Sequence, residues 1–471
     1  MKVATKFGLI VGTRGFFNPR LAAEGRKQLT AKLKSLGYGY VILPQDATPT
    51  TAVETLEDAQ KCARLFQEHR SEIVGVIVAL PNFGDELGVV NALNLAGLGV
   101  PVLVQASDDE MDKVDVEHRR DSFCGKLSVC NNLYQYGIPL TDTTYHTCAI
   151  GSKEFAEDIR FFARVCRVVN GLRNARIGAV GARPTAFQTM RASEKLLQAS
   201  GITVVTVDLS ELIFAAQALD DRARAVKAKV QAIRDYGTIP DYIEDAKVVR
   251  AAKFSVALDH WVAENNVQAA GVQCWTSIQR NYGCGACLAM SLLSNKLIPC
   301  CCEVDVGGAV SMLALVLATG EPAALLDWNN NYGEDRDMCV NTHCSSYPKG
   351  FFRSNIEIAN LDVLGASLGE DICFGAVKGK VAAGPMTYFR ISTDDRSARI
   401  RAYVGEGEFT DDPFGMAGGI AVCRVARLQA LMKHLCRNGF EHHVAMVRSH
   451  CAAVLQEAVT TYLKWDLHRH D

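Results

Sequence analysis

Short, nearly continuous apolar runs separated by amphipathic stretches dominate the first part of the chain. Such runs stand at 7–12, 40–44, 73–80 and 100–105, and the helix-like stretches include 21–37 and 55–69. A strand that is covered by helices on both faces of a parallel sheet has this composition. The pattern therefore predicts a doubly wound, Rossmann-like α/β domain over residues 1–172.

A second set of apolar runs begins near residue 175. Further strands are expected at 202–207, 269–275, 298–304 and 323–328. From about residue 365 the chain shows short alternating runs with frequent glycine, which predict an antiparallel, β-barrel-like domain. Two helices are expected to close the chain, at 424–437 and 443–464.

We therefore expect three domains. The first is the α/β domain at 1–172, and the second is another Rossmann-like α/β domain at 173–320, which carries Glu303. The third is a C-terminal β-rich domain with terminal helices at 321–471, which carries His443.

Composition excludes several classes of protein. The 471 residues are 48% hydrophobic and 22% charged, as in a well-packed globular chain. A net charge of −2 gives no electrostatic footprint for nucleic acid or an anionic membrane. No apolar run reaches the length of a membrane span, and no signal peptide is evident. Seventeen irregularly spaced cysteines, many inside apolar runs, predict thiols kept reduced in the cytoplasm.

Two carboxylates are expected at the ends of neighbouring strands. Glu303, in "CCCEVDVGGA" at 300–309, would end the strand 298–304, and Asp327 would end the strand 323–328. One helix at 309–319 would join the two strands in a βαβ unit that aims both side chains into one cleft. A single strand-end carboxylate more often caps a helix or pairs with lysine, but the repeated placement favours a site for Mn²⁺ or Mg²⁺.

Three histidines are candidates to complete this site. His343 lies 16 residues beyond Asp327, and His442 and His443 stand at an expected turn into the final helix. Adjacent histidines point to different faces, so at most one of the pair joins a given metal ion. The other can orient substrate or transfer a proton.

A cysteine-ligated metal site is the competing interpretation of this region. Residues 284–287 form a C-x-x-C, and Cys300, Cys301 and Cys302 are consecutive. A zinc site usually shows two spaced C-x-x-C pairs, and consecutive cysteines on a regular strand cannot all reach one ion. Packing thiols are the favoured interpretation over structural zinc or an iron–sulfur cluster.

Several loops carry groups that suit a polar small molecule. Arg14 and Arg20 follow the first expected strand, but the loop lacks the G-x-G-x-x-G of a dinucleotide site. Amide and aromatic residues that suit sugar hydroxyls and sugar faces lie in other loops. These candidate substrate-binding residues are Asn82, Gln273, Trp275 and Trp328.

With these residues in view, the chain resembles the L-fucose isomerase and L-arabinose isomerase superfamily in domain order over nearly its full length. In "CEVDVGGA", Glu303 matches the family's metal-binding glutamate, and in "LLDWNNNY", Asp327 matches the second metal-binding acid. In "EHHVA", His443 matches the C-terminal histidine ligand, and His343 matches a histidine ligand of the arabinose branch. The chain is shorter than typical fucose isomerases, so their C-terminal substrate contacts do not carry over.

The resemblance implies a metal-dependent aldose–ketose isomerase that acts on a free sugar through a cis-enediolate, with Mn²⁺, Mg²⁺ or Co²⁺ polarising the substrate oxygens. Glu303 and Asp327 would be ligands and the acid–base pair, His343 and His443 ligands, and His442 a substrate contact. The family forms trimers or hexamers in which the first domain of one subunit closes the active site of its neighbour. That arrangement would give Arg14 and Arg20 a place in the site.

Two alternatives remain open beside a neutral sugar. One is isomerisation of an anionic sugar such as the sulfonated hexose sulfoquinovose, whose charge Arg14, Arg20, Arg183 and Arg353 could neutralise. The other is a non-catalytic sugar-binding or sensor protein, since two α/β domains around a cleft also describe such binders. A redox protein is a third and weaker hypothesis.

Overall fold

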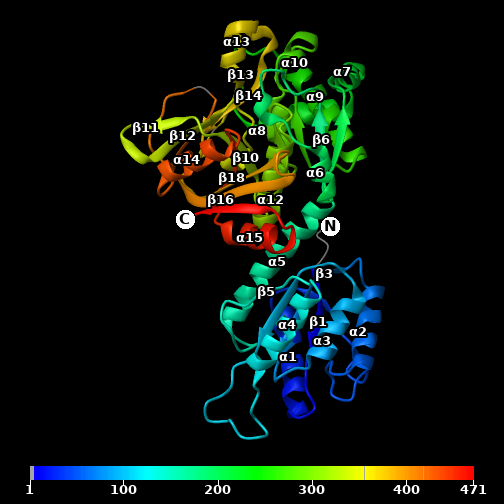
Figure 1. Ribbon diagram of the computed structural model, residues 1–471. Helices are drawn as coiled ribbons and strands as arrows, with labels where there is room; N and C mark the ends of the chain where they lie inside the picture. Colours follow the sequence, from blue (N-terminus) through cyan, green and yellow to red (C-terminus); the bar gives the residue numbers. More distant parts are fainter. Residues whose placement is uncertain (1–4, 355, 417) are drawn as a thin grey trace. The chain divides into compact units, whose positions relative to one another are not determined.

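The computed structural model describes residues 5–354, 356–416 and 418–471, which form two compact units (Figure 1). Unit 1 consists of Met1–Asn170 and Glu457–Lys464, and unit 2 of Gly171–Gln456 and Trp465–Asp471. The division into three domains stays a prediction. Within the described ranges, no helix has the length and apolarity that crossing a bilayer requires.

Unit 1 is built on a parallel five-stranded sheet with the order β2-β1-β3-β4-β5. Its strands are β1 (Lys6–Val11), β2 (Gly39–Val41), β3 (Ile73–Leu80), β4 (Val102–Ala106) and β5 (Thr141–Asp142). The helices of this part of the chain are α1 (Pro19–Ser35), α2 (Leu56–Glu68), α3 (Glu86–Ala96), α4 (Ser122–Gln135) and α5 (Lys153–Arg173). Parallel strands and intervening helices follow the expectation from the apolar runs.

Helices cover both faces of this sheet. Along β3, Val76 and Val78 pack in the apolar cluster that contains residues of α2, α3 and α4. The alternate residues Ile77 and Ala79 pack in a second cluster with residues of α1 and α5. Because successive strand residues point to opposite faces, a strand with two buried faces must be apolar throughout.

Unit 2 contains a second parallel sheet, of four strands in the order β7-β6-β8-β9. Its strands are β6 (Arg176–Val180), β7 (Thr203–Val207), β8 (Ala269–Val272) and β9 (Cys300–Cys301). The helices that accompany them are α6 (Glu194–Ala199), α7 (Leu209–Ala218), α8 (Arg224–Tyr236), α9 (Asp245–Glu264), α10 (Ser277–Asn281), α11 (Cys287–Asn295) and α12 (Val306–Thr319).

The rest of unit 2 holds a large, mainly antiparallel sheet with the central order β10-β18-β15-β16-β17-β12-β11. These strands are β10 (Ala323–Asp327), β11 (Asn330–Tyr332), β12 (Asp335–His343), β15 (Gly384–Asp394), β16 (Arg399–Phe409), β17 (Gly419–Arg424) and β18 (His443–Val447), and β13 (Glu357–Asn360), β14 (Phe374–Lys380) and β19 (Asp466–His470) pair at the side. The helices here are α13 (Asp362–Leu368), α14 (Leu428–Asn438) and α15 (Ala452–Gln456). Pairing among the described strands does not close this path into a barrel, so closure stays a prediction.

Helix α12 packs against strands of both sheets of unit 2, with β6 and β8 on one side and β10, β15 and β18 on the other. Twelve of its fourteen residues are buried. A helix that is apolar all round lies in a protein interior. Its N-terminus, which follows Glu303 and begins beside Asp305, is therefore fixed between the two sheets.

Two expectations about local structure were wrong. The final helix expected at 443–464 begins instead as the strand β18, which pairs with both β10 and β15. The run "HVAMV" is buried along its whole length, and periodicity alone does not distinguish a short apolar strand from a buried helix. Only at 452 does the chain become helical, in α15 and a π-helical turn at Glu457–Tyr462.

The expected βαβ unit was also wrong. The strands before and after α12, which are β9 and β10, belong to different sheets, and β9 ends at Cys301. Glu303 therefore lies in a turn after the strand, whereas Asp327 is the last residue of β10. The two carboxylates still approach the same place, because α12 spans the distance between the two sheets.

Candidate metal centre and its cavity

Glu303 lies in an unusually tight turn. Both Glu303 and Val304 have left-handed backbone conformations, with φ of 55° and 54°, and α12 begins two residues later. Non-glycine residues in this region are strained and cluster at functional sites. The turn presses against β8, where a Cβ added at Gly271 would lie 2.7 Å from the carbonyl carbon of Val304 and 2.8 Å from the nitrogen of Asp305.

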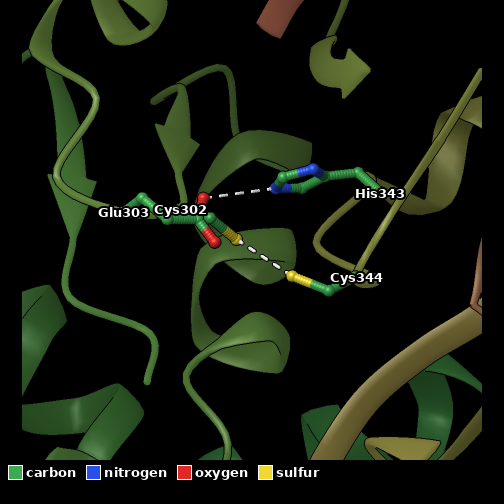
Figure 2. A group of neighbouring side chains, drawn as sticks. All are labelled: Cys302, Glu303, His343 and Cys344. Carbon is green, nitrogen blue, oxygen red and sulfur yellow. Dashed lines mark hydrogen bonds and ion pairs between the residues drawn. The ribbon is translucent and has the colours of Figure 1, made fainter. Parts of the chain in front are cut away.

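The carboxylate of Glu303 is held on one oxygen only. Its Oε1 accepts hydrogen bonds from Trp275 Nε1 at 2.9 Å and Cys274 Sγ at 3.3 Å. Its Oε2 is buried and has no hydrogen-bond partner among the described residues. This oxygen lies 3.5 Å from His343 Nε2, which Figure 2 shows directed at the carboxylate, and 3.7 Å from His443 Nε2.

Asp327 and His443 are brought together by strand pairing. They are directly opposite one another in the antiparallel pair β10–β18, and His443 Nε2 lies 3.5 Å from Asp327 Oδ1. His343 ends β12 and places its Nδ1 3.2 Å from both carboxylate oxygens of Asp327. The two imidazole rings are perpendicular, with centroids 5.0 Å apart.

We call Glu303, Asp327, His343 and His443 the cage. Three buried atoms of the cage, Glu303 Oε2, His343 Nε2 and His443 Nε2, lack hydrogen-bond partners among the described residues. Buried polar atoms are nearly always satisfied, so three such atoms within 3.7 Å of a neighbour require an explanation. A divalent cation that prefers oxygen and imidazole ligands fits this donor set.

Asp305 contacts the cage through the imidazole nitrogen of His443 that faces away from the other cage residues. Its Oδ2 accepts a hydrogen bond from His443 Nδ1 at 2.8 Å, which leaves Nε2 with a lone pair directed at the cage. The carboxylate also pairs with both terminal nitrogens of buried Arg390, at 2.5 and 3.0 Å, and its Oδ1 caps α12 at the nitrogen of Gly308. Such carboxylate–histidine pairs orient imidazole ligands of metals.

The charge of this support is fixed. Burial raises the pKa of Asp305, but the guanidinium of Arg390 and the contact with His443 outweigh it, so the pKa lies well below its usual value. Glu441 is a second carboxylate beside Arg390. It accepts hydrogen bonds from Arg390 Nε at 3.3 Å and from Ser392 Oγ at 2.9 Å. Asp305 is therefore an anion at any ordinary pH.

Asp327 and His343 titrate as partners. Burial raises the pKa of Asp327, but the charge and hydrogen bond of His343 lower it by more. The net shift of the pKa is therefore downward. Burial lowers the pKa of His343, but the charge of Asp327 outweighs this and raises it well above its usual value. Without a metal ion, the pair is therefore an imidazolium and a carboxylate.

The cage opens into a cavity of ≈ 330 Å³, which is the size of a small-ligand site. Phe187, Trp275 and His442 form an aromatic wall, in which the Phe187 ring meets Trp275 edge-on at 5.3 Å and His442 at 5.8 Å. The lining also includes apolar side chains of α13 and of the residue before it, which are Leu361, Val363 and Leu364. The described residues that line the cavity include no lysine or arginine.

Four predicted site residues form the cage and two line its cavity. Trp275 and His442 line the cavity, and Trp275 also holds Glu303. Gln273 lies two residues away, but its Oε1 accepts from the nitrogen of Ala182. The indole of Trp328 donates to Tyr403 and packs in the core of the large sheet.

The remaining predicted site residues lie in unit 1. Arg14 pairs with Asp85 and Glu86 and stacks over Phe83. Asn82 is fully buried and donates to Thr13 Oγ1. Arg20 is exposed at the start of α1.

Sequence reasoning missed Asp305, Arg390 and Phe187. Asp305 stands in the same "EVD" string as Glu303, and this spacing of two was the available signal. Arg390 lies 85 residues from Asp305, in a strand that reads as ordinary sheet, so no local pattern marked it. Phe187 ends the "VGARPTAF" loop, in which Arg183 donates to the carbonyls of Pro184 and Phe187 and so holds its own loop.

Two groups of described residues could hold a metal ion, Cys302, Glu303, His343 and Cys344 in one and Asp327, His442 and His443 in the other. Fold and site together define an α/β protein with a candidate metal centre beside a small-molecule cavity. Residues 8–173 match the family model of the fucose/sulfoquinovose isomerase N-terminal domain, and residues 341–470 match that of the L-fucose isomerase C-terminal domain. The chain belongs to the fucose isomerase-like superfamily.

Curated relatives carry a more specific name. Sulfoquinovose isomerase of Alkalicoccus urumqiensis is 26% identical over 296 residues, which cover 62% of this chain and 65% of that protein. Sulfoquinovose isomerase of Clostridium sp. (strain MSTE9) is 29% identical over 216 residues, 43% of this chain and 45% of that protein. That of Priestia aryabhattai is 25% identical over 294 residues, 60% and 62% of the two chains. Each match spans less than two thirds of the relative's own length.

Among solved structures, an ABC transporter solute binding protein from Mycobacterium smegmatis matches 59% of this chain and 78% of its own. The identity is 12% and the TM-score 0.17, so this likeness carries no argument about fold or function.

Proposed function

We propose that this chain is a metal-dependent aldose–ketose isomerase whose substrate is a sulfonated hexose such as sulfoquinovose. The observation that carries the proposal is the cage, in which a carboxylate oxygen and two imidazole nitrogens are buried without partners among the described residues, beside a cavity of ≈ 330 Å³. The names of the curated relatives favour the sulfonated sugar over the neutral sugar that was expected first. The family model of residues 8–173 names both fucose and sulfoquinovose, so it is compatible with either sugar.

The chain's own residues supply positioning and proton transfer. A divalent cation such as Mn²⁺, bound by Glu303, Asp327 and His443, would stabilise negative charge on two neighbouring substrate oxygens. The carboxylates of Glu303 and Asp327 face the cavity, where one takes the proton from the substrate carbon and returns it to the next carbon. His442 packs against His443 of the cage and would contact the substrate.

The first experiment strips the protein with EDTA and restores Mn²⁺ in the presence of sulfoquinovose, L-fucose or L-arabinose. Ketose formation, followed by NMR, is expected with sulfoquinovose and only after Mn²⁺ is restored. Glu303→Gln should abolish turnover, while Glu334→Gln, on an exposed turn, should behave as the parent. A stripped parent that converts none of the three sugars after Mn²⁺ is restored would remove the assignment.

The same variant separates an enzyme from a sugar-binding protein. In Glu303→Gln, the amide that replaces the carboxylate would keep an oxygen for Trp275 and Cys274 but lose the anionic metal ligand. A binder that needs no metal would then retain its affinity for the sugar. An isomerase would lose both turnover and Mn²⁺ binding.

A neutral sugar is the second candidate, and the lining of the cavity favours it. A sulfonate needs a cation or several donors, and the described lining residues offer neither lysine nor arginine. We infer that a sulfonated substrate would be neutralised by an arginine of a neighbouring subunit. Of the two arginines expected near the substrate, Arg20 is the better candidate to bind the sulfonate, because Arg14 already pairs with Asp85 and Glu86.

The trans arrangement that the resemblance implies can be tested with Arg20. If unit 1 of a neighbouring subunit brings this arginine to the sulfonate, Arg20→Ala should lower kcat/KM for sulfoquinovose by roughly ten-fold or more. Its effect on a sugar without the sulfonate should be small. Arg234→Ala, which removes an exposed arginine on α8, is the matched control. A monomer in solution would contradict the shared active site.

A further inference from the structure

Four thiols from four separate segments converge beside Glu303. Cys274 follows β8, Cys287 begins α11, Cys302 follows β9 and Cys344 follows β12. Three of them are at most 1% exposed, and Cys344 is partly buried against the same apolar cluster. The fold therefore concentrates sulfur at one point of the interior.

One sulfur–sulfur distance in this group matches that of two ligands on a tetrahedral ion. Cys302 Sγ and Cys344 Sγ are 3.7 Å apart and point toward one another in Figure 2. Two thiolates on one tetrahedral zinc, with bonds of ~2.3 Å, lie about 3.8 Å apart. Cys274 and Cys287 are buried in the same apolar cluster as Cys302, and the pKa of each of these two thiols responds to the thiols of Cys302 and Cys344.

Ordinary packing explains this group less well than it explains the other cysteines. Buried thiols usually act singly as small apolar side chains. Cys339 and Cys423 are neighbours only because strand pairing places them opposite one another. The cluster instead contains only Cys287 from the C-x-x-C at 284–287 and only Cys302 from the three cysteines at 300–302. Cys301 is directed away, with its thiol on backbone carbonyls.

We propose that Cys274, Cys287, Cys302 and Cys344 bind a soft divalent ion of the zinc class in a site that adjoins the cage, since Cys302 and Cys344 lie in one group of potential ligands with Glu303 and His343. Thiolates select soft ions, whereas the carboxylates of the cage select hard ones. Sulfur atoms 3.7 Å apart are in van der Waals contact, which favours one shared ion over an iron–sulfur cluster with sulfide between them. Each thiol gives its proton to solvent as its sulfur binds the ion.

The thiol site and the cage share one hydrogen bond. Cys274 donates to Glu303 Oε1, and this donor is lost when its sulfur binds an ion. Trp275 Nε1 then remains as the donor that positions the carboxylate. Cys302 and Cys344 are also the chain neighbours of Glu303 and His343, so an ion on the thiols would fix the backbone on which two cage residues stand.

Cobalt provides the test, because a thiolate bound to Co²⁺ gives a charge-transfer absorbance that carboxylate and imidazole ligands do not. The full chain is reduced, stripped with EDTA and titrated with Co²⁺. We expect one equivalent to produce the thiolate band, Zn²⁺ to abolish it, and Mn²⁺ to leave it unchanged. Cys287→Ser, at a position that does not line the cavity, should lose the band.

Matched variants keep the test decisive. Cys423→Ser removes a buried thiol outside the cluster and should retain the band. Cys344→Ser, at the least buried of the four thiols, replaces Cys287→Ser if that variant does not fold by circular dichroism. A reduced parent without a thiolate band, or a band that survives both cluster variants, overturns the proposal. Sugar turnover without the band would leave the proposed function intact, and the band without turnover would leave this site intact.

Discussion

Asp305 is the single residue on which the geometry of the cage most depends. Asp305→Asn would leave the guanidinium of Arg390 buried with only Glu441 as a charged partner among the described residues. Breaking a buried pair in this way costs roughly 3–5 kcal/mol. Loss of the carboxylate behind His443 should also weaken Mn²⁺ binding by about 10–100-fold. Urea unfolding of the metal-free protein and a Mn²⁺ titration measure the two effects.

Asp335→Asn is the control for this variant. Asp335 pairs with Arg424 on the surface, where ion pairs contribute little, so neither measurement should change. The pKa of Asp305 is lowered in the folded protein, so its contribution is present above its unfolded pKa of about 3.9 and is lost as the pH falls below that value. Equal stability of parent and Asp305→Asn at neutral pH would contradict the role assigned to the pair.

His343 predicts how Mn²⁺ affinity depends on pH. Its pKa is raised well above the usual value by Asp327, so the metal-free protein holds a proton on this ring at neutral pH. A cation that takes the lone pair of Nε2 must displace that proton, so Mn²⁺ affinity should rise as the pH rises toward the raised pKa of His343. Calorimetric titrations in buffers of different ionisation enthalpy would report the released proton. His343→Gln should flatten the dependence, and an unchanged slope would remove His343 from the ligands.

The stability of the metal-free protein depends on pH in the opposite direction to its Mn²⁺ affinity. A raised folded pKa means that the His343–Asp327 pair stabilises the metal-free protein fully below the unfolded pKa of about 6.5. This contribution is lost as the pH rises through the folded pKa. Metal-free and Mn²⁺-bound protein should therefore diverge in stability as the solution becomes alkaline.

Residue chemistry was the part of the site that the sequence made predictable. Carboxylates at the ends of two expected strands indicated Glu303 and Asp327, and the resemblance to the isomerase superfamily added His343 and His443 as ligands. Two features had no local signal. The left-handed backbone at Glu303 and Val304 depends on the close approach of Gly271, and the partner of Asp305 comes from β15.

At the scale of elements, β8 and the turn after β9 set the position of Glu303. Gly271→Ala would place a methyl group 2.7–2.9 Å from the backbone of Val304 and Asp305. Backbone atoms cannot rotate away, so the turn must shift, at a cost of about 1–3 kcal/mol. We expect lower thermal stability and weaker Mn²⁺ binding together. Gly151→Ala, where the methyl group would meet no atom within 4 Å, is the control.

Strand registry explains why the cage forms although β9 and β10 do not share a sheet. Asp327 and His443 face one another across β10 and β18, 116 positions apart in the numbering, and this pairing was hidden by the expectation of a helix at 443–464. The parallel strands of unit 1 were predictable because burial on both faces leaves a continuous apolar run. The central antiparallel strand β18 also has a nearly continuous apolar sequence, but it is only five residues long. Such a short run does not distinguish a strand from a buried helix.

At the scale of the whole molecule, the two compact units make different contributions. All four cage residues belong to unit 2, whereas Arg14, Arg20 and Asn82 belong to unit 1. Sequence patterns located the α/β character of both units. They did not locate the return of the chain to unit 1 at Glu457–Lys464, because that segment is held by long-range contacts such as the hydrogen bond from Thr141 to Glu457.

This division predicts how the metal ion affects heat unfolding. A ligand stabilises the part of a protein that binds it, by about 2.7 kcal/mol at a free concentration of 100 times Kd. Calorimetry of the EDTA-treated protein should show two transitions, of which Mn²⁺ raises only the one that belongs to unit 2. Hydrogen exchange identifies that transition through the amides of α12 and β18, which carry the cage. Glu303→Gln should remove the shift while leaving both transitions in place, because the amide keeps its hydrogen bonds to Trp275 and Cys274. A single transition, or an equal shift of both, would mean that the units unfold together and that the cage stabilises the entire chain.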